Sequence, residues 1–519
     1  MSLSSRLDPA VERLAAAFPG PGGACAVVKD GEVVVAHAWG YANAELRLPF
    51  SAKSLFRICS ITKQFTCAAV LDAVGDPSVL DADVAARLPH LQGAAPPALR
   101  LMHNQSGLRD YWAVAMMMGA GAEDPFGPAQ ARQAIETERT LQFAPGTAYS
   151  YCNQNFRILS EALEAREGRP FGDILRRRVF DVAGMETAIL GADTRALPDA
   201  SEGYEGSPAT GFRPAVNRVV WTGDAGIAAS LEDMIAWERH IDATRDDPGS
   251  LYRRLSEPVA FVDGGPASYG FGLGRGRQFG REVTSHGGAL RGWRSHRLHM
   301  ASERLSVVVL FNHLSDAHTA AADLLAAALG EEKPAEPQRL AEPGWLGAWI
   351  DPSTQLSARI DMAGEGRVRL RYGHSAEVLD VQADGSASTE AGLRLSADGV
   401  ALRLDRPGEN RVVTLEPRSG PVANDVSGRY HCEEINSDVT VVDAGGALYG
   451  GFSGPLGEGR MERLDPIGPD LWALPCWRAL DHTPPGDFTL CFQRDGAGAP
   501  GQLVAGCWLA RGLRYERVG

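Results

Sequence analysis

The chain has 519 residues, of which 44% are hydrophobic and 22% charged, so it can form about three globular domains. Its formal net charge of -14 opposes binding to nucleic-acid phosphates and to anionic lipid surfaces. No stretch approaches the roughly 18 consecutive apolar residues of a membrane span, and Asp8 and Glu12 interrupt the region where a signal peptide would be apolar. We therefore expect a cytoplasmic protein that binds neither nucleic acid nor membranes.

The cysteine and histidine patterns indicate no metal site. The eight cysteines are dispersed without a Cys-x-x-Cys pair, which favours reduced thiols. The sequence contains no HExxH motif, no zinc-type Cys/His spacing, no P-loop and no dinucleotide fingerprint. His296 and His299 are interpreted as strand residues rather than ligands. No metal or other cofactor is therefore expected.

Helical and strand patterns alternate through the first 330 residues. Ala24–Ala36 reads as two strands joined at Asp30-Gly31, a dipeptide typical of tight hairpins. Ser230 and Asp233 resemble a capping box at a helix start, and Arg304–Asn312 has the apolar run of a buried strand. The predicted helices span Thr62–Val74, Asn155–Arg166, Ser230–Ile241 and Ala317–Leu329.

The composition changes after residue 330. The stretch Gly330-Glu-Glu-Lys-Pro-Ala-Glu-Pro337 is charged and interrupted by prolines, as linkers are. Beyond it, short alternating runs are separated by turn residues, and Leu346–Ile350 resembles Ser427–His431. We predict a catalytic domain over 1–330, a linker over 331–343, and two small antiparallel β-barrels over 344–418 and 424–519.

One lysine is a candidate for chemistry. The chain has only four lysines, and Lys63 follows Ser60 by three residues at a predicted helix start. At that spacing the hydroxyl and the amine share one helix face, where a neutral lysine can activate a serine nucleophile. Burial and the positive end of the helix dipole both favour the neutral amine. The backbone N–H of Ser60 is also a candidate oxyanion donor.

Three motifs in order resemble those of the serine β-lactamase-like, penicillin-recognising family. They are Phe56-Arg-Ile-Cys-Ser-Ile-Thr-Lys-Gln-Phe-Thr66, Pro145-Gly-Thr-Ala-Tyr-Ser-Tyr-Cys-Asn153 and His286-Gly-Gly288. Further matches are His103–Leu108, Gly223–Ser230 and Tyr269–Gly272, so the resemblance covers most of residues 20–330. It implies an α+β fold, in which an antiparallel sheet is flanked by helices.

The resemblance also implies roles for individual residues. Tyr151 would pass protons between nucleophile and leaving group, while the Asn153 amide would orient Lys63 and the substrate. His286 would stabilise the site or the leaving group, and the N–H of Ala289 would be the second oxyanion donor. The third motif starts with histidine where most members have lysine, so recognition of a free substrate carboxylate is less expected.

The long β region resembles that of the D-aminopeptidases in this family, which carry two barrels and are homodimeric. In them a loop from the last barrel presents an aspartate to the substrate amine, and the matching residue here is Asp481. Trp477, Arg478 and His482 belong to the same predicted specificity loop. The resemblance implies an aminopeptidase that releases a small N-terminal D-residue, D-Ala above all, through a serine acyl-enzyme, and that assembles as a homodimer.

Three alternatives remain open from sequence. A D-amino-acid amidase or esterase would use the same nucleophile without requiring a free amine, and a D,D-carboxypeptidase would require a carboxylate instead. A penicillin-binding sensor would be acylated without turnover. The presence of both Tyr151 and His286 favours turnover over the sensor.

Overall fold

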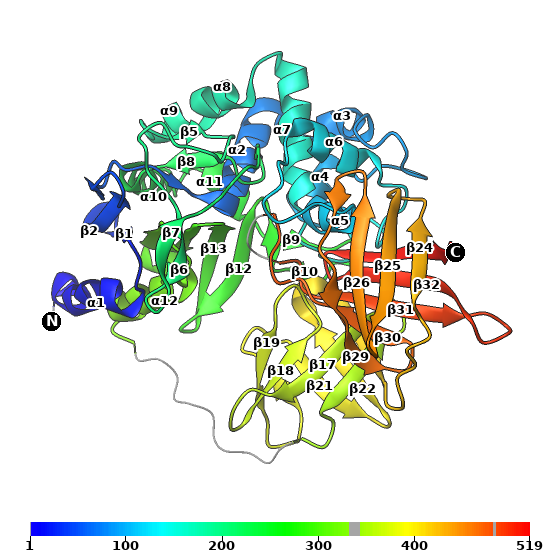
Figure 1. Cartoon of the computed structure of the whole chain (residues 1–519). Helices are drawn as coiled ribbons and strands as arrows, with labels where there is room; N and C mark the ends of the chain where they lie inside the picture. Colours follow the sequence, from blue (N-terminus) through cyan, green and yellow to red (C-terminus); the bar gives the residue numbers. More distant parts are fainter. Residues whose placement is uncertain (1, 332–342, 481–483, 519) are drawn as a thin grey trace.

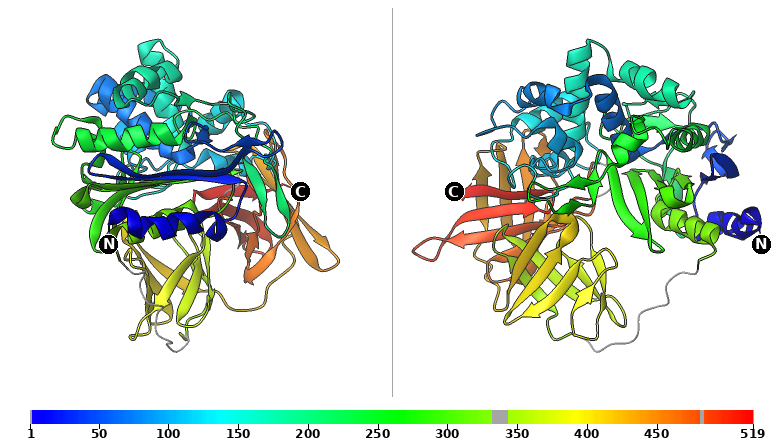
Figure 2. Two further views of the ribbon diagram at one scale, coloured as in Figure 1. Left: turned by 90° about the vertical axis from the view of Figure 1, so that its left-hand side faces the viewer. Right: turned by 180° about the vertical axis from the view of Figure 1, so that it is seen from behind.

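The structure is a computed structural model that describes residues 2–331, 343–480 and 484–518. Most of the predicted linker, 332–342, lies outside these residues, as do two candidate specificity residues, Asp481 and His482. Figures 1 and 2 show a mixed α/β part at the N-terminal side and two β units at the C-terminal side.

An antiparallel sheet forms the centre of the N-terminal part. Within the described residues it has eight strands in the order β11-β12-β13-β14-β15-β1-β2-β3. The predicted hairpin is confirmed, because β1 and β2 pair antiparallel around the turn at Asp30-Gly31. The strands are β1 (Gly22–Lys29), β2 (Glu32–Asn43), β3 (Leu48–Pro49), β11 (Tyr269–Gly270), β12 (Leu273–Gln278), β13 (Arg281–Leu290), β14 (Trp293–Met300) and β15 (Leu305–Phe311).

Two helices cover one face of this sheet. The helices α1 (Leu3–Ala17) and α12 (Ala317–Leu329) pack on each other, with α1 also on β2 and α12 on β14 and β15 (Figure 2). Their apolar side chains form a separate core cluster with β1, β14 and β15. The bounds predicted for α12 are confirmed, since Asp316 caps its start and Gly330 ends it in the left-handed conformation.

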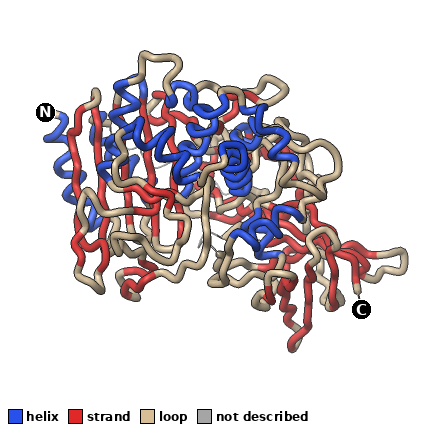
Figure 3. The backbone as a smooth tube through the Cα atoms, turned by 90° about the horizontal axis from the view of Figure 1, so that it is seen from above, coloured by secondary structure: helices blue, strands red, loops and turns tan. Residues whose placement is uncertain are grey.

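The other helices lie over the opposite face, as the view from above in Figure 3 shows. The capping box predicted for Ser230 and Asp233 is present at the start of α10. The helices are α2 (Thr62–Val74), α3 (Asp81–Ala85), α4 (Ala98–Met102), α5 (Tyr111–Met117), α6 (Pro128–Glu136), α7 (Asn153–Glu167), α8 (Phe171–Leu175), α9 (Asp181–Ala183), α10 (Leu231–Ala243) and α11 (Leu251–Ser256). Short strands complete this part: β4 (Phe56–Arg57), β5 (Ile189–Leu190), β6 (Tyr204–Ser207), β7 (Gly211–Pro214), β8 (Ile227–Ala229), β9 (Val259–Ala260) and β10 (Pro266–Ala267).

The first β unit is a closed barrel. Its first and last strands pair through Trp349 and Pro417, which closes the sheet and leaves no unpaired edge between them. Inward residues such as Leu370 and Leu404 are fully buried. The strands are β16 (Gly347–Asp351), β17 (Leu356–Met362), β18 (Arg367–Arg371), β19 (Glu377–Val381), β20 (Ala387–Ser388), β21 (Arg394–Asp398), β22 (Ala401–Arg406) and β23 (Arg411–Pro417).

The second β unit is a strongly curved half-barrel. The described strands follow the order β27-β26-β25-β24-β33-β32-β31-β30-β29, with β28 paired to β26. The predicted α+β class with two C-terminal β units is thus confirmed, although among the described residues only the first unit closes into a barrel. The strands are β24 (Gly428–Cys432), β25 (Ser437–Ala444), β26 (Ala447–Gly454), β27 (Gly457–Glu458), β28 (Glu462–Arg463), β29 (Asp465–Gly468), β30 (Leu471–Leu474), β31 (Phe488–Arg494), β32 (Pro500–Cys507) and β33 (Ala510–Arg517).

Both β units contact the N-terminal part. A turn of the first, η5 (Pro407–Glu409), bonds to Tyr149 N through the carbonyl of Glu409. A hairpin of the second, β32–β33, bonds to Asp110 N through the carbonyl of Leu509. Among the described helices, none combines the length and apolar character that crossing a bilayer requires.

Candidate active site

Ser60 lies where a short strand turns into a helix. The chain leaves β4, passes through a single 3₁₀ turn, η1 (Cys59–Ile61), and continues as α2. Cys59 has a φ of 51°, a left-handed conformation that is unfavourable for a residue with a side chain. Its thiol donates to the carbonyl of Arg57 and is buried. The turn holds the Ser60 side chain partly exposed at the base of a cavity.

Lys63 is fully buried, and three oxygen atoms surround its amine. Nζ lies 2.9 Å from Ser60 Oγ, 2.8 Å from Asn153 Oδ1 and 2.8 Å from the carbonyl oxygen of Asp224. The amide and carbonyl oxygens can only accept hydrogen bonds. When the amine is neutral, they therefore take its two N–H groups and leave its lone pair directed at Ser60.

Tyr151 completes the group around Ser60. Its side chain is hydrogen-bonded to that of Ser60, and its ring centroid lies 4.9 Å from Lys63 Nζ. Burial raises the pKa of the phenol well above its usual value of 10. The hydroxyl is therefore protonated at neutral pH and can donate a proton.

The amide of Asn153 is held from behind by a buried carboxylate. Asp110 Oδ2 accepts hydrogen bonds from the Asn153 backbone N (2.5 Å) and from its Nδ2 (2.8 Å). Asp110 is completely buried, and burial raises the pKa of its carboxyl to about 6 against the lowering effect of these bonds and of Lys63. Sequence reasoning missed this residue, although it follows the matched segment His103–Leu108 by only two positions.

The third motif lies on a strand with a free edge. β12 pairs with β13 only as far as Ser285, so in the described structure residues 286–290 pair with β14 alone. His286 is nine-tenths buried, with Nδ1 2.6 Å from the Gly287 carbonyl and Nε2 3.0 Å from the Tyr269 hydroxyl. Since a carbonyl only accepts, Nδ1 carries the proton and Nε2 accepts from Tyr269. Burial and nearby Lys63 lower the pKa of His286 to about 3, so the ring is neutral.

A cavity of about 440 Å³ joins these groups. Its lining includes six residues that belong to the three predicted motifs or directly follow one: Ser60, Tyr151, Asn153, His286, Gly288 and Ala289. Lys63 does not line the cavity but lies next to Ser60, to which it is hydrogen-bonded. Both predicted oxyanion donors, the backbones of Ser60 and Ala289, therefore belong to residues of one cavity. Aromatic side chains of Trp112, Tyr149 and Trp221 form much of the remaining wall.

The second β unit reaches the same cavity at two places. Trp508 and Leu509, at the turn of the β32–β33 hairpin, line it together with Pro485 from the loop between β30 and β31. His374 of the first barrel also contributes. The Trp508 Nε1 donates to Glu409 Oε2 (3.2 Å), so the two β units brace this wall together. Trp508 and Leu509 were not predicted, because nothing in a short Trp-Leu turn marks it locally as part of a distant site.

Two residues of the predicted specificity loop lie outside the cavity. Arg478 Nη2 is 2.9 Å from both Glu123 Oε1 and Glu205 Oε2, which docks the loop on the N-terminal part. Trp477 is 77% exposed and lines a second cavity between the two β units. The prediction that Trp477 belongs to a specificity loop stays a prediction, and the structure places its side chain in the second cavity rather than beside Ser60. The described residues hold no group of three His, Cys, Asp or Glu side chains suited to a metal ion.

Family models and known relatives agree with this architecture. The β-lactamase family model matches residues 11–332, and the model for domain B of D-aminopeptidase matches residues 338–516. The chain is thus a β-lactamase-like hydrolase with an additional C-terminal β region. It is 57% identical to a D-aminopeptidase of Gluconobacter oxydans over 100% of this chain and 99% of that one. A D-aminopeptidase of Cereibacter sphaeroides is 49% identical, with 99% of each chain covered. The chain belongs to the D-aminopeptidase family.

Solved structures support the fold. An octameric penicillin-binding protein homologue from Pyrococcus abyssi matches 87% of this chain and 99% of its own with a TM-score of 0.52 at 18% identity. A D-amino acid amidase from Ochrobactrum anthropi, solved with D-phenylalanine, matches 63% of this chain and 98% of its own with a TM-score of 0.51 at 20% identity. At these identities the likeness extends to the fold alone.

Proposed function

We propose that the protein is an aminopeptidase that hydrolyses peptides and amides with a small N-terminal D-residue, most readily D-Ala, through an acyl-enzyme on Ser60. The family and its D-aminopeptidase relatives support the D-amino-acid substrate. The observation that carries the proposed chemistry is the arrangement of acceptors around Lys63 Nζ, which directs a neutral amine at Ser60 Oγ.

Acylation starts at the Ser60 hydroxyl. Its oxygen attacks the substrate carbonyl carbon while Lys63 Nζ accepts the hydroxyl proton. The backbone N–H groups of Ser60 and Ala289 stabilise the negative charge on the carbonyl oxygen. The C–N bond then breaks, and the leaving nitrogen receives a proton from the Tyr151 hydroxyl, which regains one from protonated Lys63. The products of this step are the free amine and an ester of Ser60.

Deacylation again uses Lys63 as the proton carrier. Water attacks the ester carbonyl and gives its proton to Lys63 Nζ, which is neutral again after the first step. The Ser60 oxygen leaves as the alkoxide and takes that proton back, so the D-amino acid is released and the site is regenerated. His286 serves this cycle as a neutral residue that positions Tyr269 and the free edge of β13.

We propose that Asp481 selects the substrate ammonium. Pro485, four residues further along the same loop, lines the cavity, and Arg478 docks the preceding segment, which supports a loop directed toward the site. A carboxylate there would attract an N-terminal ammonium and repel a C-terminal carboxylate. The neutral state of His286 further removes the positive charge that a carboxypeptidase would offer its substrate.

Hydrolysis of p-nitroanilides tests the proposal. D-Ala p-nitroanilide should be cleaved much faster than the L-enantiomer, and Ser60→Ala should abolish the reaction. In Lys63→Arg the guanidinium stays protonated at neutral pH and cannot accept a proton, so kcat should fall by about 10³-fold or more. Lys53→Arg, a substitution on the surface, is the control and should leave kcat unchanged. An active Lys63→Arg variant would remove the lysine from the base role.

A second pair of substrates tests the selection of a free amine. Wild type should prefer D-Ala amide over N-acetyl-D-Ala amide, and Asp481→Ala should lose that preference. Equal rates on both substrates in wild type would favour an amidase or esterase instead. A burst of one product per enzyme without a following steady state would identify a sensor.

A further inference from the structure

Asp110 connects the second β unit to the lysine without touching the nucleophile. It is the N-cap of α5, where its Oδ1 accepts from Trp112 N (2.8 Å). Its other oxygen, Oδ2, accepts both N–H groups of Asn153. The side chain is completely buried, so each of these bonds replaces hydration that the carboxylate loses on folding.

This pairing fixes which way the Asn153 amide faces. A carboxylate accepts hydrogen bonds and donates none, so the Asn153 NH₂ group must point toward Asp110. The amide oxygen then points away from Asp110 and accepts from Lys63 Nζ at 2.8 Å. Were the amide reversed, an NH₂ group would face the lysine, and the lysine would lose one of its two fixed acceptors. Asp110 therefore determines the geometry on which the lysine lone pair depends.

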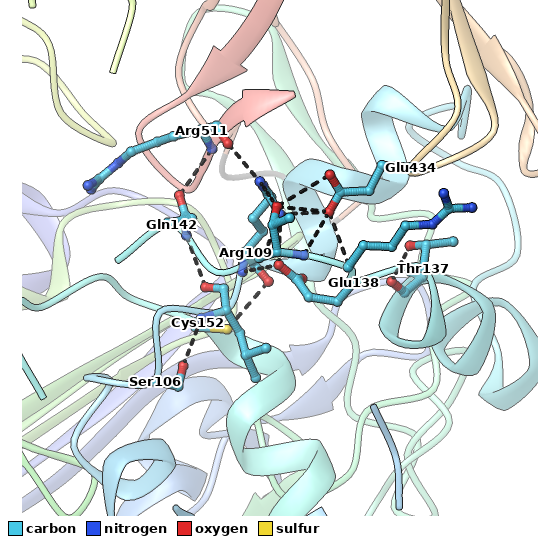
Figure 4. A network of polar contacts seen from close by, with 12 residues as sticks. Ser106, Arg109, Thr137, Glu138, Gln142, Cys152, Glu434 and Arg511 are labelled. Atoms are coloured by element: carbon cyan, nitrogen blue, oxygen red, sulfur yellow. Dashed lines mark hydrogen bonds and ion pairs between the residues drawn. The ribbon is translucent and has the colours of Figure 1, made fainter. Parts of the chain in front are cut away.

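The position of Asp110 depends in turn on the β32–β33 hairpin. Its backbone N donates to the Leu509 carbonyl (2.9 Å), and the preceding Arg109 donates to the Arg511 carbonyl (2.9 Å). Gln142 bridges the same elements by accepting from Arg511 N (3.0 Å) and donating to the Leu108 carbonyl (3.0 Å). Figure 4 shows Arg109, Gln142 and Arg511 in this network.

We propose that Asp110 is a positioning residue for the catalytic lysine, acting through the Asn153 amide, and that the β32–β33 hairpin holds it in place. The inference rests on the proposed role of Lys63. It gives the second β unit a part in the chemical step itself, because the hairpin backbone is bonded to the residue that orients Asn153. A loop that only selects substrates would leave the chemical step unchanged.

The charge of Asp110 gives the inference a pH dependence. Burial raises the pKa of its carboxyl to about 6, and protonation would add an O–H that competes with the Asn153 donors. The orienting effect is therefore close to complete at pH 8, about half present near pH 6, and lost as the pH falls further. Titratable groups facing Asp110 are Lys63 of α2, Tyr111 of α5, Tyr151 and Cys152 before α7, and Cys507 of β32.

The variant Asp110→Asn tests this with minimal disturbance. Asparagine has the same shape and caps helices about as well as aspartate, so the bond to Trp112 N can persist. It also places an NH₂ group in front of two N–H donors of Asn153. At pH 8 we expect kcat to fall about 100-fold with little change in KM, a size typical of misplacing a catalytic group by about 1 Å. The thermal midpoint should move by only a few degrees.

The pH profile separates orientation from general damage. Because protonated Asp110 resembles asparagine, the difference between wild type and Asp110→Asn should narrow from about 100-fold at pH 8 to about 10-fold at pH 5. Asp76→Asn is the matched control, since Asp76 is also an N-cap aspartate, at the start of the 3₁₀ turn η2 (Pro77–Leu80), but lies on the surface. It should match wild type at every pH. Asp110→Glu keeps the charge and should recover part of the rate if the longer side chain still reaches Asn153.

Labelling of Ser60 by a fluorophosphonate gives a readout that needs no natural substrate. The serine oxygen displaces fluoride from phosphorus while Lys63 accepts its proton, and intact mass reports the rate. Slower labelling of Asp110→Asn at pH 8 supports the inference; equal labelling of the two proteins overturns it.

If wild type itself is not labelled, the proposed nucleophile fails, and a crystal structure of Asp110→Asn decides instead. Retention of the 2.8 Å contact between Lys63 and Asn153 there would overturn the inference.

Discussion

The two β units use the same kind of strand yet contact the N-terminal part differently. The first closes into a barrel and contacts it chiefly through the turn Pro407–Asn410. The second stays open, and its β32–β33 hairpin and its β24–β25 turn make buried polar contacts with the segment Leu108–Thr140. Closure satisfies strand edges internally, so a closed barrel needs few outside partners. An open sheet can instead extend its hairpins into a neighbouring site.

The centre of the second interface is a buried ion network. Arg109 Nη1 lies 2.9 Å from Glu138 Oε1 and 3.1 Å from Glu434 Oε1 at the β24–β25 turn. Figure 4 shows these three side chains converging between the helical part and the half-barrel. The Arg109 and Glu138 side chains are only 5% and 3% exposed, so water cannot solvate either charge if its partner is removed. We therefore expect that disrupting the second interface lowers the free energy of unfolding more than disrupting the first does.

The largest effect is expected for Arg109→Ala. Removing this guanidinium leaves the Glu138 carboxylate buried without its partner, which should cost about 3–5 kcal/mol in free energy of unfolding. Chemical denaturation measures it. Arg139→Ala is the control, because Arg139 pairs with the exposed Glu433 on the same face and should cost about 0–1 kcal/mol. Equal losses of unfolding free energy in the two variants would contradict the larger contribution assigned to the buried ion network.

Glu409→Ala tests whether the first barrel affects the site at all. Glu409 accepts from Arg406 (2.7 Å) and from Trp508 Nε1 (3.2 Å), so its loss should cost about 2 kcal/mol and release the tryptophan that lines the cavity. We expect kcat/KM to fall several-fold. Glu377→Ala removes another carboxylate from the same Arg406 without touching Trp508, so it should reduce stability alone. A rate loss in Glu377→Ala would mean that the effect is not transmitted through Trp508.

These contacts mark the limit of what the sequence could predict. The bounds of α2 and α12 and the capping box of α10 followed from local patterns, since caps and apolar periodicity act within a few residues. The four residues that the structure brings together in the site followed from motifs: Ser60, Lys63, Tyr151 and Asn153. By contrast, the bond from Asp110 to the Leu509 carbonyl joins residues about 400 positions apart, and only folding brings them together.

Side-chain direction was equally beyond the sequence. The motif placed His286 in the site, but its neutral state arises from burial and from the nearby charge of Lys63, which lower its pKa against the opposing effect of the bond to the Gly287 carbonyl. The sequence predicted one specificity loop, whereas in the structure Arg478 is bound by Glu123 and Glu205 and Trp477 lies outside the cavity at Ser60. Local sequence defines which residues share a turn, and tertiary charge pairing decides which of them points inward.

A pH-dependent effect on the free energy of unfolding is expected at Glu138. Burial raises the pKa of its carboxyl to about 7, although Arg109 opposes the shift. A group whose pKa is raised in the folded state contributes stability below its ordinary pKa and loses it as the pH rises to the folded value. Relative to Glu138→Gln, wild type should therefore lose up to about 3 kcal/mol of stability between pH 4.5 and pH 8, since the pKa rises from 4.5 to about 7 and each pKa unit corresponds to about 1.4 kcal/mol. Denaturation at both values measures the difference, and a constant difference would contradict the raised pKa.

The smallest effect is expected at the turn of the closed barrel. Asn410 Nδ2 donates to the Thr147 carbonyl (3.0 Å) and to Asp263 Oδ2 (2.9 Å), and its φ of 54° is left-handed. Asn410→Gly removes the side chain without strain, so it reports these exposed bonds alone and should cost less than about 1 kcal/mol. Asn410→Ala adds the strain of a left-handed alanine, about 1 kcal/mol more.

Neither Asn410 variant should change kcat, because the Tyr149 N bond to the Glu409 carbonyl belongs to the backbone and survives both substitutions. Steady-state rates with D-Ala p-nitroanilide measure this. If Asn410→Gly lowered kcat as much as Asp110→Asn does, the closed barrel would take as large a part in the chemical step as the open one. The contrast between a self-contained barrel and an inserted half-barrel would then be lost.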